Sequence, residues 1–287
     1  MKDNAGAVKE FTRGVEVNAS HGTVDWKDVA ATGVAFGYVT VSRGLTEEEG
    51  QHIAANWQSM KEAGVLRGGY HYLRPLKDVE SQARRFGEIL AKLGGYELPP
   101  AVRLKAVGTQ SGVNEWEVIP QGKRIELLLR WLEIVERAAG RKCVLATNVP
   151  FLQRHLGGFA ALTDRDIWIA DYRATGEPPA PQPWPQWTFW RYSESGTLPG
   201  VSAPVSLNYF NGARAELDRY ASSAEGPAAV DQAASKASSA VVDDSGAAPS
   251  DTAAAVAPDS VDDVEKTPAP DSTEPSRVRS KKASKRD

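Results

Sequence analysis

Short apolar runs recur along the first 220 residues of the chain, and each run has the length of a β-strand. Stretches with apolar residues at helical spacing separate the early runs. Strands that alternate with helices predict a parallel sheet or a barrel with the helices outside. The runs are Gly14–Ser20, Gly33–Ser42, Arg67–Pro75, Ala101–Gly108, Lys142–Asn148, Asp166–Tyr172, Trp187–Ser193 and Pro204–Phe210.

Three of the intervening segments carry the signals of a helix. Leu45–Gly64 has acidic residues early and a glycine at its end, and Asp78–Gly95 holds Gly94 where a C-terminal cap is expected. Gly122–Gly140 places leucines and isoleucines near helical spacing. No comparable segment separates the last three runs. We therefore expect an α/β fold, an irregular TIM-like β/α barrel of about eight strands whose last strands lack full helices.

The fourth run, Ala101–Gly108, carries two cations on one face. Leu98–Gly108 is typical of a buried strand, in which Leu104 and Ala106 share one face and Arg103 and Lys105 share the other. Two long cations then point toward one spot. Because β/α barrels carry their chemistry at the C-terminal ends of the strands, this spot lies where an active site is expected.

By the same rule, the polar and aromatic residues that end the runs are candidates for a site. They are Glu16, Asn18, Thr40, Arg43, His71, Tyr72, Arg103, Lys105, Thr147, Asn148, Asp171, Tyr172, Arg191, Tyr192, Ser206 and Asn208. The four histidines are scattered, and the sequence has neither a glycine-rich phosphate loop nor metal-ligand spacing. We expect no metal and no cofactor.

The composition separates a folded part from a tail. All aromatic residues of the 287-residue chain lie before residue 221, and the remainder is rich in Ala, Ser, Pro and Asp. Such a segment cannot bury enough apolar surface to offset its chain entropy. We expect an N-terminal extension over 1–12, the barrel over 13–221 and a disordered tail over 222–287. The basic end of the tail, at 277–286, either solubilises it or contacts an anionic partner.

Charge and cysteine content narrow the classes of partner and compartment. The formal net charge of -3 gives no general attraction to nucleic acid, so nucleic-acid binding is not expected. Cys143 is the single cysteine, which excludes an intrachain disulfide and fits a small buried apolar side chain. The polar start and the lack of a long apolar run predict neither a signal peptide nor a membrane span. We expect a cytoplasmic protein that lysis or a signal-independent secretion route could export.

Several separate segments follow one family pattern in order and spacing. They are "GVEVNASHGTVDWKDVAATGVAFGYVTVSRG", "AGVLRGGYHYLRP", "LPPAVRLK", "DIWIADY" and "WTFWRYSESGTLPGVSAPVSLNYFNG". From Arg13 to Tyr220 the sequence resembles glycoside hydrolase family 25, the Chalaropsis-type lysozymes or N-acetylmuramidases. The resemblance implies a β/α barrel that cleaves peptidoglycan, with an acid and a second carboxylate acting on the glycosidic bond.

The acidic residues of the family pattern are replaced in this chain. Glu16 and Ser206 stand where the family has Asp. Arg103 and Lys105 stand where it has its catalytic Asp-x-Glu. Three more positions, which the family fills with Lys, Glu and Gln, hold Thr40, Arg43 and Arg191. The structural residues of the family remain, namely Trp26, Tyr70, His71, Trp168, Tyr192 and Asn208.

These replacements predict a loss of hydrolysis. The transition state of glycoside cleavage resembles an oxocarbenium cation, which Arg103 and Lys105 repel. Arginine cannot donate a proton near neutral pH. We expect Glu16 to pair with Arg103 or Lys105. The other acids near the strand ends are expected to be loop or surface carboxylates: Glu115, Glu117 and Asp171.

We therefore expect a catalytically inactive muramidase-like protein that binds a peptidoglycan-type glycan or another protein. Aromatic and polar side chains suit such a groove, and the candidates are Arg43, His71, Tyr72, Asn148, Trp168, Tyr172, Trp190, Arg191, Tyr192 and Asn208. Two alternatives stay open. One is a structural, adaptor or immunity-type accessory protein of a secretion or phage-like assembly. The other is an active N-acetylmuramidase with rearranged acids.

Overall fold

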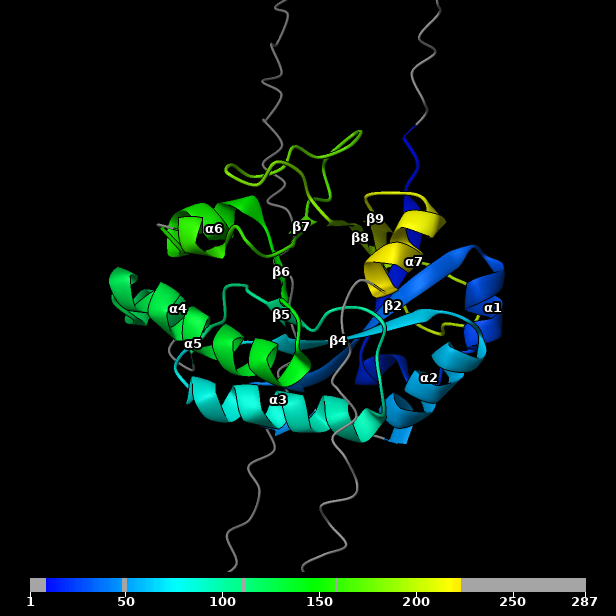
Figure 1. Cartoon of the computed structure of the whole chain (residues 1–287), viewed down its shortest axis with the longest axis horizontal. Helices are drawn as coiled ribbons and strands as arrows, with labels where there is room; N and C mark the ends of the chain where they lie inside the picture. Colours follow the sequence, from blue (N-terminus) through cyan, green and yellow to red (C-terminus); the bar gives the residue numbers. More distant parts are fainter. Residues whose placement is uncertain (1–8, 48–50, 110–111, 158, 223–287) are drawn as a thin grey trace, which may run out of the picture. The chain divides into compact units, whose positions relative to one another are not determined.

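A computed structural model describes residues 9–47, 51–109, 112–157 and 159–222 (Figure 1). Apart from Ser222, the expected tail over 222–287 lies outside the described residues, and so does its basic end at 277–286. Most of the expected N-terminal extension over 1–12 lies outside them as well. Among the described helices, none is long and apolar enough to cross a membrane.

The strands of the described residues form one sheet that closes on itself. They are β1 (Thr12–Val17), β2 (Val34–Arg43), β3 (Thr46–Glu47), β4 (Leu66–Tyr72), β5 (Ala101–Arg103), β6 (Val144–Thr147), β7 (Ile167–Ala170), β8 (Phe189–Gly196) and β9 (Val205–Phe210). Their order is β1-β9-β8-β7-β6-β5-β4-β2-β3, and β1 also pairs with β2. The predicted eight-stranded barrel is confirmed, with the short β3 as a hairpin partner of β2 outside the ring.

The helices cover the barrel unevenly. They are α1 (Trp26–Ala31), α2 (Gln51–Glu62), α3 (Val79–Leu93), α4 (Glu115–Val118), α5 (Gln121–Ala139), α6 (Val149–His155) and α7 (Arg214–Ser222), with 3-10 turns at Ala19–His21 and Phe159–Leu162. The long helices α2, α3 and α5 lie along one side of the barrel (Figure 1). No helix of the described residues separates β7 from β8 or β8 from β9, as the sequence predicts.

The helix predicted over Leu45–Gly64 begins later than expected. Thr46 and Glu47 pair with the end of β2 as strand β3, and the helix begins at Gln51. The other two long helices end as predicted. Gly94 and Gly140 have φ angles of 74° and 68°, and this left-handed conformation ends α3 and α5 at glycine.

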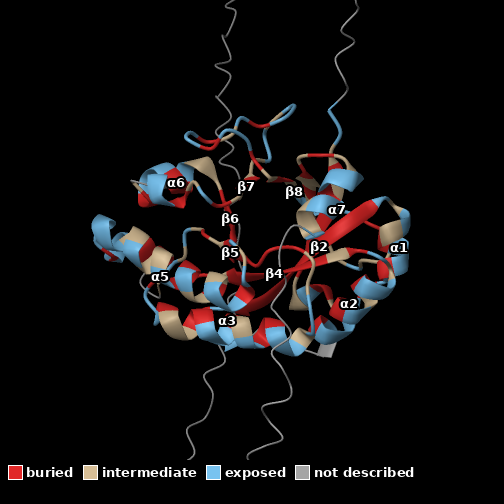
Figure 2. Ribbon diagram, in the orientation of Figure 1, coloured by how far each residue is buried: buried red, intermediate tan, exposed pale blue. Residues whose placement is uncertain are grey.

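Aromatic side chains make up much of the inside of the barrel, and a larger cluster of mixed aliphatic and aromatic side chains fills the layer between strands and helices. The inner aromatic residues are Phe36, Tyr38, Tyr70, Trp168, Phe189 and Phe210. Two glycines make room for them. A Cβ atom on Gly14 would lie 2.2 Å from the ring of Phe36, and one on Gly68 would lie 2.3 Å from the ring of Tyr38. Figure 2 shows the resulting pattern of buried strands and helices exposed on their outer faces.

Strand β5 is shorter than the sequence pattern predicts. It ends at Arg103, so the prediction of one strand over Leu98–Gly108 is wrong. The alternation of side chains holds as far as Lys105 and fails at Ala106, which is exposed. After β5 the chain leaves the sheet, and the Lys105 carbonyl accepts a hydrogen bond from the Trp116 indole Nε1 at 3.0 Å.

His71 belongs to the layer between strands and helices. Its side chain is completely buried, and its ring stacks on that of Trp131 at 5.4 Å. The ring nitrogens lie 2.8 Å from Ser42 Oγ and 3.0 Å from Gln82 Oε1. With both nitrogens engaged inside the protein, His71 does not face a ligand at the strand ends. Burial lowers its pKa to about 4, against the raising effect of the Gln82 hydrogen bond.

This burial predicts a loss of stability in acid. The folded protein holds His71 neutral down to about pH 4, whereas the unfolded chain protonates it near pH 6.5. His71 therefore favours the folded state above pH 6.5, and this contribution is lost as the pH falls toward 4, by about 3 kcal/mol. We expect the non-titrating variant His71→Gln to have a flatter dependence of unfolding free energy on pH in this window, measured by urea denaturation.

The matched control is His52→Gln, which removes an exposed histidine. Its curve should run parallel to that of the unmodified protein. A His71→Gln curve that is equally parallel between pH 4 and 6.5 would contradict the assignment.

Candidate functional site

Side chains from distant parts of the chain converge inside the barrel at the C-terminal ends of its parallel strands. Glu16 lies near the end of β1, and Arg103 ends β5 beside Tyr72 of β4. Arg191 of β8 pairs in register with Asn208 of β9. Because alternate residues of a strand share a face, these side chains point toward the barrel axis. We name Glu16, Arg103 and Arg191 the mouth cluster.

The mouth cluster is a buried ion-pair network. Arg191 Nε and Nη2 donate to Glu16 Oε1 and Oε2, one to each oxygen. The side chains of Glu16 and Arg191 are only 4% and 3% exposed. Arg103 Nη1 lies 3.7 Å from Glu16 Oε2, with its side chain 11% exposed. The predicted pairing of Glu16 with Arg103 is present, but Arg191 makes the two closer contacts.

Burial and charge act in opposite directions on Glu16. Burial raises the pKa of Glu16 and is only partly offset by Arg103, Asn208 and Tyr70, so the net pKa is about 7. For Arg103, burial lowers the pKa but the Glu16 carboxylate raises it, with a net upward shift. A raised carboxyl pKa is a property of general acids. In this site, however, a bidentate guanidinium occupies both oxygens and favours the ionised form.

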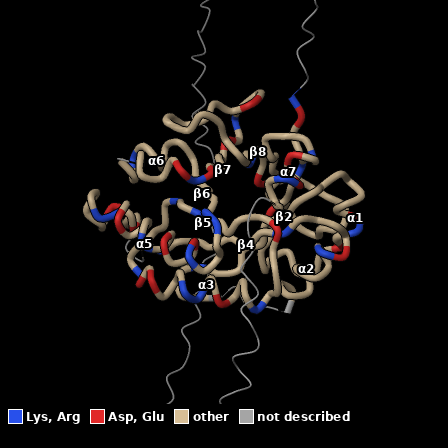
Figure 3. The backbone as a smooth tube through the Cα atoms, in the orientation of Figure 1, with Lys and Arg blue, Asp and Glu red and all other residues tan. Residues whose placement is uncertain are grey.

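A second group of cations lies around Tyr72 at the edge of the mouth. Arg43 Cζ is 4.4 Å from the centre of the Tyr72 ring, and Lys105 Nζ is 5.1 Å from it. Both distances suit cation–π attraction. Arg43 is exposed and Lys105 is half-buried, so both contribute positive charge at the surface of the mouth. Figure 3 shows basic positions where β5 leaves the barrel.

The floor beneath the mouth cluster is held by Trp168 and Asn208. Trp168 Nε1 donates to Asn208 Oδ1 at 3.0 Å, and Asn208 Nδ2 donates to the carbonyl of Ser206 at 3.3 Å. The guanidinium carbon of Arg191 lies 5.5 Å from the Trp168 ring. Arg191 is therefore fixed on one side by the indole and on the other by the Glu16 carboxylate.

Some residues predicted for the groove lie elsewhere. Trp190 and Tyr192 flank Arg191 in β8, so they point to the outer wall of the barrel. Asn148 caps α6, accepting a hydrogen bond from the Phe151 N–H at 2.8 Å. Tyr172, in contrast, is 44% exposed at the rim. Burial raises its pKa and the nearby Arg103 guanidinium lowers it.

The other candidate acids divide between the interior and the surface. Glu115 is buried, and its Oε1 accepts a hydrogen bond from Arg74 Nε at 2.9 Å, so the prediction of a surface carboxylate is wrong. Glu117 is an exposed residue that pairs with Arg154 at 3.5 Å. Asp171 accepts a hydrogen bond from the N–H of Arg173 at 3.0 Å in a loop. Among the described residues, no group of three or more His, Cys, Asp or Glu could hold a metal ion.

The ion-pair network predicts a large effect of removing Arg191. Arg191→Met leaves the Glu16 carboxylate buried with only part of its compensation, and this class of change costs about 3–5 kcal/mol. Burial raises the pKa of Glu16 to about 7 even with Arg191 in place, and loss of this guanidinium raises it further. The protonated form favours folding, so the stability of the variant should rise as the pH falls from above 7 toward 4.5, and the rise should begin at a higher pH than in the unmodified protein. Urea denaturation at several pH values measures this.

The control removes both charges together. The double variant Glu16→Gln/Arg191→Met should be more stable at neutral pH than Arg191→Met alone, because the buried carboxylate is gone and the cation that loses it as a partner, Arg103, keeps some contact with water at 11% exposure. Exposed ion pairs contribute about 0–1 kcal/mol to stability. If Arg191→Met lowers the free energy of unfolding by less than about 1 kcal/mol, and equally at every pH, the buried ion-pair network is contradicted.

Comparison with known proteins places the chain in a family. The sequence model of glycosyl hydrolases family 25 matches residues 15–201. Lysozyme M1 of Streptomyces globisporus is 26% identical over 215 residues, covering 71% of this chain and 69% of that protein. The uncharacterized protein YegX of Escherichia coli strain K12 is also 26% identical over 215 residues, covering 72% of each chain.

Solved structures have the same fold. The bacterial lysozyme from Streptomyces coelicolor superposes with a TM-score of 0.65 and 26% identity, covering 75% of this chain and 98% of that one. A family 25 glycosyl hydrolase from Bacillus anthracis gives a TM-score of 0.62 at 21% identity, covering 77% of this chain and 96% of that one. With the family model spanning most of the barrel, the chain belongs to glycosyl hydrolases family 25.

Proposed function

We propose that this chain binds peptidoglycan through the mouth of its barrel without hydrolysing the glycosidic bonds. The observation that carries the proposal is the mouth cluster. Arg103 ends β5 at a position where the family pattern has a catalytic acid, and Arg191 takes up both oxygens of Glu16. The family and the relatives named as lysozymes support peptidoglycan as the polymer.

The electrostatics of the mouth oppose the chemistry of glycoside cleavage. Positive charge develops at the anomeric carbon in the transition state. A cation about 4 Å away costs about 4 kcal/mol at an effective dielectric constant of 20. Since about 1.4 kcal/mol is a factor of ten in rate, one such cation slows the step by roughly a thousandfold. At Arg103 and Lys105, positive charges stand where the family pattern has anions that stabilise the transition state.

The same charges favour the binding of an anionic polymer. Peptidoglycan carries carboxylates on its stem peptides, which Arg43 and Lys105 at the edge of the mouth can attract. Tyr172 at the rim adds an exposed aromatic surface for a sugar face.

One observation favours the second candidate, an active muramidase. Burial raises the pKa of Glu16 to about 7, which suits a general acid working near neutral pH. This candidate requires Arg191 to release a carboxylate oxygen and another acid to act as the second carboxylate. Glu115 is held by Arg74, and Asp171 closes a turn with Arg173.

The test of inactivity is the release of reducing ends from purified peptidoglycan. We expect the full chain to release no more than its Glu16→Gln variant, because Glu16 is held in an ion pair and the cations repel the transition state. An active lysozyme under the same conditions is the positive control. Turnover by the unmodified chain that disappears with Glu16→Gln would overturn the proposal and establish the second candidate.

Binding is tested by sedimentation with peptidoglycan sacculi. Arg43→Glu/Lys105→Glu reverses two charges at the mouth, and we expect about tenfold weaker binding with a smaller dependence on salt. The matched control, Lys123→Glu/Arg137→Glu, makes the same charge change on the exposed side of α5. Equal binding by both variants would contradict binding at the mouth. If the unmodified chain does not sediment, the proposal fails and the adaptor alternative gains.

A further inference from the structure

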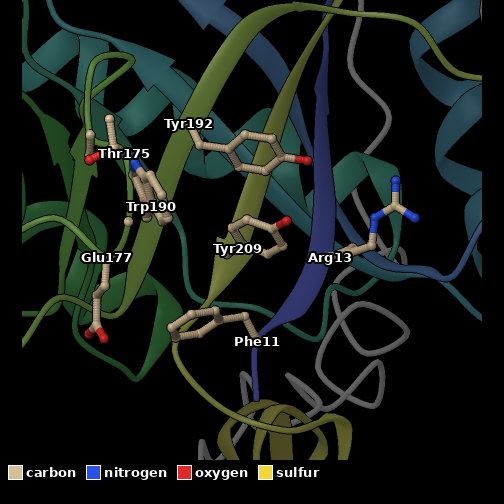
Figure 4. Close-up of a pocket in the computed structure, with 9 residues that line it drawn as sticks. Phe11, Arg13, Thr175, Glu177, Trp190, Tyr192 and Tyr209 are labelled. Carbon is tan, nitrogen blue, oxygen red and sulfur yellow. The ribbon is translucent and has the colours of Figure 1, made fainter. Parts of the chain in front are cut away.

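The outer wall of the barrel at β8, β9 and the start of β1 carries a second concave surface. It is a pocket of about 590 Å³, within the range of small-ligand sites. No long helix of the described residues follows β7 or β8 in the chain to cover this wall. Phe11, Trp190, Tyr192 and Tyr209 form its aromatic part, and the loop at 174–177 forms its opposite edge. Figure 4 shows Tyr192 and Tyr209 next to β1, with Trp190, Thr175 and Glu177 on the side away from it.

Tyr209 is the centre of the aromatic surface. Its ring is stacked with that of Tyr192 at 4.4 Å and 17° between planes. The rings of Trp190 and Phe11 both lie 5.7 Å from it. Phe11, Tyr192 and Tyr209 are half-buried, so part of each ring faces the pocket. This mutual packing fixes the rings before any ligand arrives, which reduces the entropy cost of binding.

The polar rim of the pocket has no dominant sign of charge. Glu177 forms an ion pair with Lys9, and Arg13 Nη1 donates to the Thr32 carbonyl at 2.7 Å. The hydroxyl of Thr175 lies on the exposed loop. Such a rim offers donors and acceptors to hydroxyl groups but no excess charge to attract an ion.

We infer that this pocket is a second saccharide site, which binds an uncharged segment of a glycan chain. Sugar rings have an apolar C–H face that packs on aromatic rings and hydroxyl groups at the edge that need hydrogen-bond partners. The fixed aromatic surface and the mixed rim supply both. The site lies on the opposite face of β8 from Arg191, so it is separate from the mouth and does not depend on the charges there.

The test is calorimetric titration of the full chain with an uncharged N-acetylglucosamine oligomer. Gly176 lines the pocket, and a Cβ atom there would meet no other atom within 4 Å. Gly176→Leu therefore adds bulk at the edge of the pocket without a clash at Cβ, and we expect about tenfold weaker binding. Gly122→Leu is the matched control, because Gly122 lies equally free of contacts on α5. It should bind as the unmodified chain does.

A second pair of variants tests the rings themselves. Tyr192→Ala/Tyr209→Ala should weaken binding at least as much as Gly176→Leu, whereas Tyr192→Phe/Tyr209→Phe keeps the stacked faces and should retain most of the affinity. Unfolding midpoints establish which variants are folded; Gly176→Leu remains decisive if the alanine pair is not.

The inference is overturned if the unmodified chain does not bind the oligomer. It is also overturned if Gly176→Leu binds the oligomer as tightly as the unmodified chain does. If Arg43→Glu/Lys105→Glu then loses oligomer binding, the sugar binds in the mouth, and the proposed function stands. If the unmodified chain binds the oligomer but does not sediment with sacculi, the proposed function fails and the inference stands.

Discussion

The burial of one carboxylate between two guanidinium groups organises the mouth of this barrel. Glu16 cannot remain ionised at 4% exposure without compensation, because removing a charge from water costs several kcal/mol. Arg191 supplies two hydrogen bonds and Arg103 a further charge at 3.7 Å. The positions of these arginines are thereby tied to that of the acid. Trp168 and Asn208 then hold Arg191 and the floor beneath it.

Closure of the sheet makes this network possible. Arg191 and Glu16 are 175 residues apart in the sequence, and they meet because β9 joins β8 to β1. The closure itself depends on the aromatic filling of the barrel, which needs the space left by Gly14 and Gly68. A side chain at either glycine would force an inner ring to move, and the strand ends above it would lose their spacing.

Local patterns in the sequence account for most of the fold. The apolar runs identify the strands that form the ring, and glycines in the left-handed conformation mark the ends of α3 and α5. The hairpin strand β3 was missed because two residues carry no periodicity. Strict alternation around Arg191 places Trp190 and Tyr192 on the outer face of β8, as the structure shows.

The sequence alone does not predict ion pairs between residues that are far apart in the chain. The position of Glu115 after a predicted strand is typical of a loop acid. In the structure it is buried and forms an ion pair with Arg74, which lies 41 residues earlier in the chain. Arg191 could be recognised as unusual only against the family pattern, and its partner became evident only with the closed barrel. Charge-to-charge contacts have no period along a chain, so their geometry has to come from the structure.

The network also constrains how the site could change. Replacing Arg103 with an acid removes a cation from Glu16 and adds a like charge close to it, so the pKa values of both carboxyl groups would rise. Replacing Arg191 alone leaves Glu16 buried with less compensation. Either single step weakens the fold before a working pair of acids exists. An acidic pair could be built without loss of stability only if Arg103 and Arg191 were replaced together, because the effects of these substitutions are coupled through Glu16. This coupling opposes any single substitution that would reverse the positive charge of the mouth.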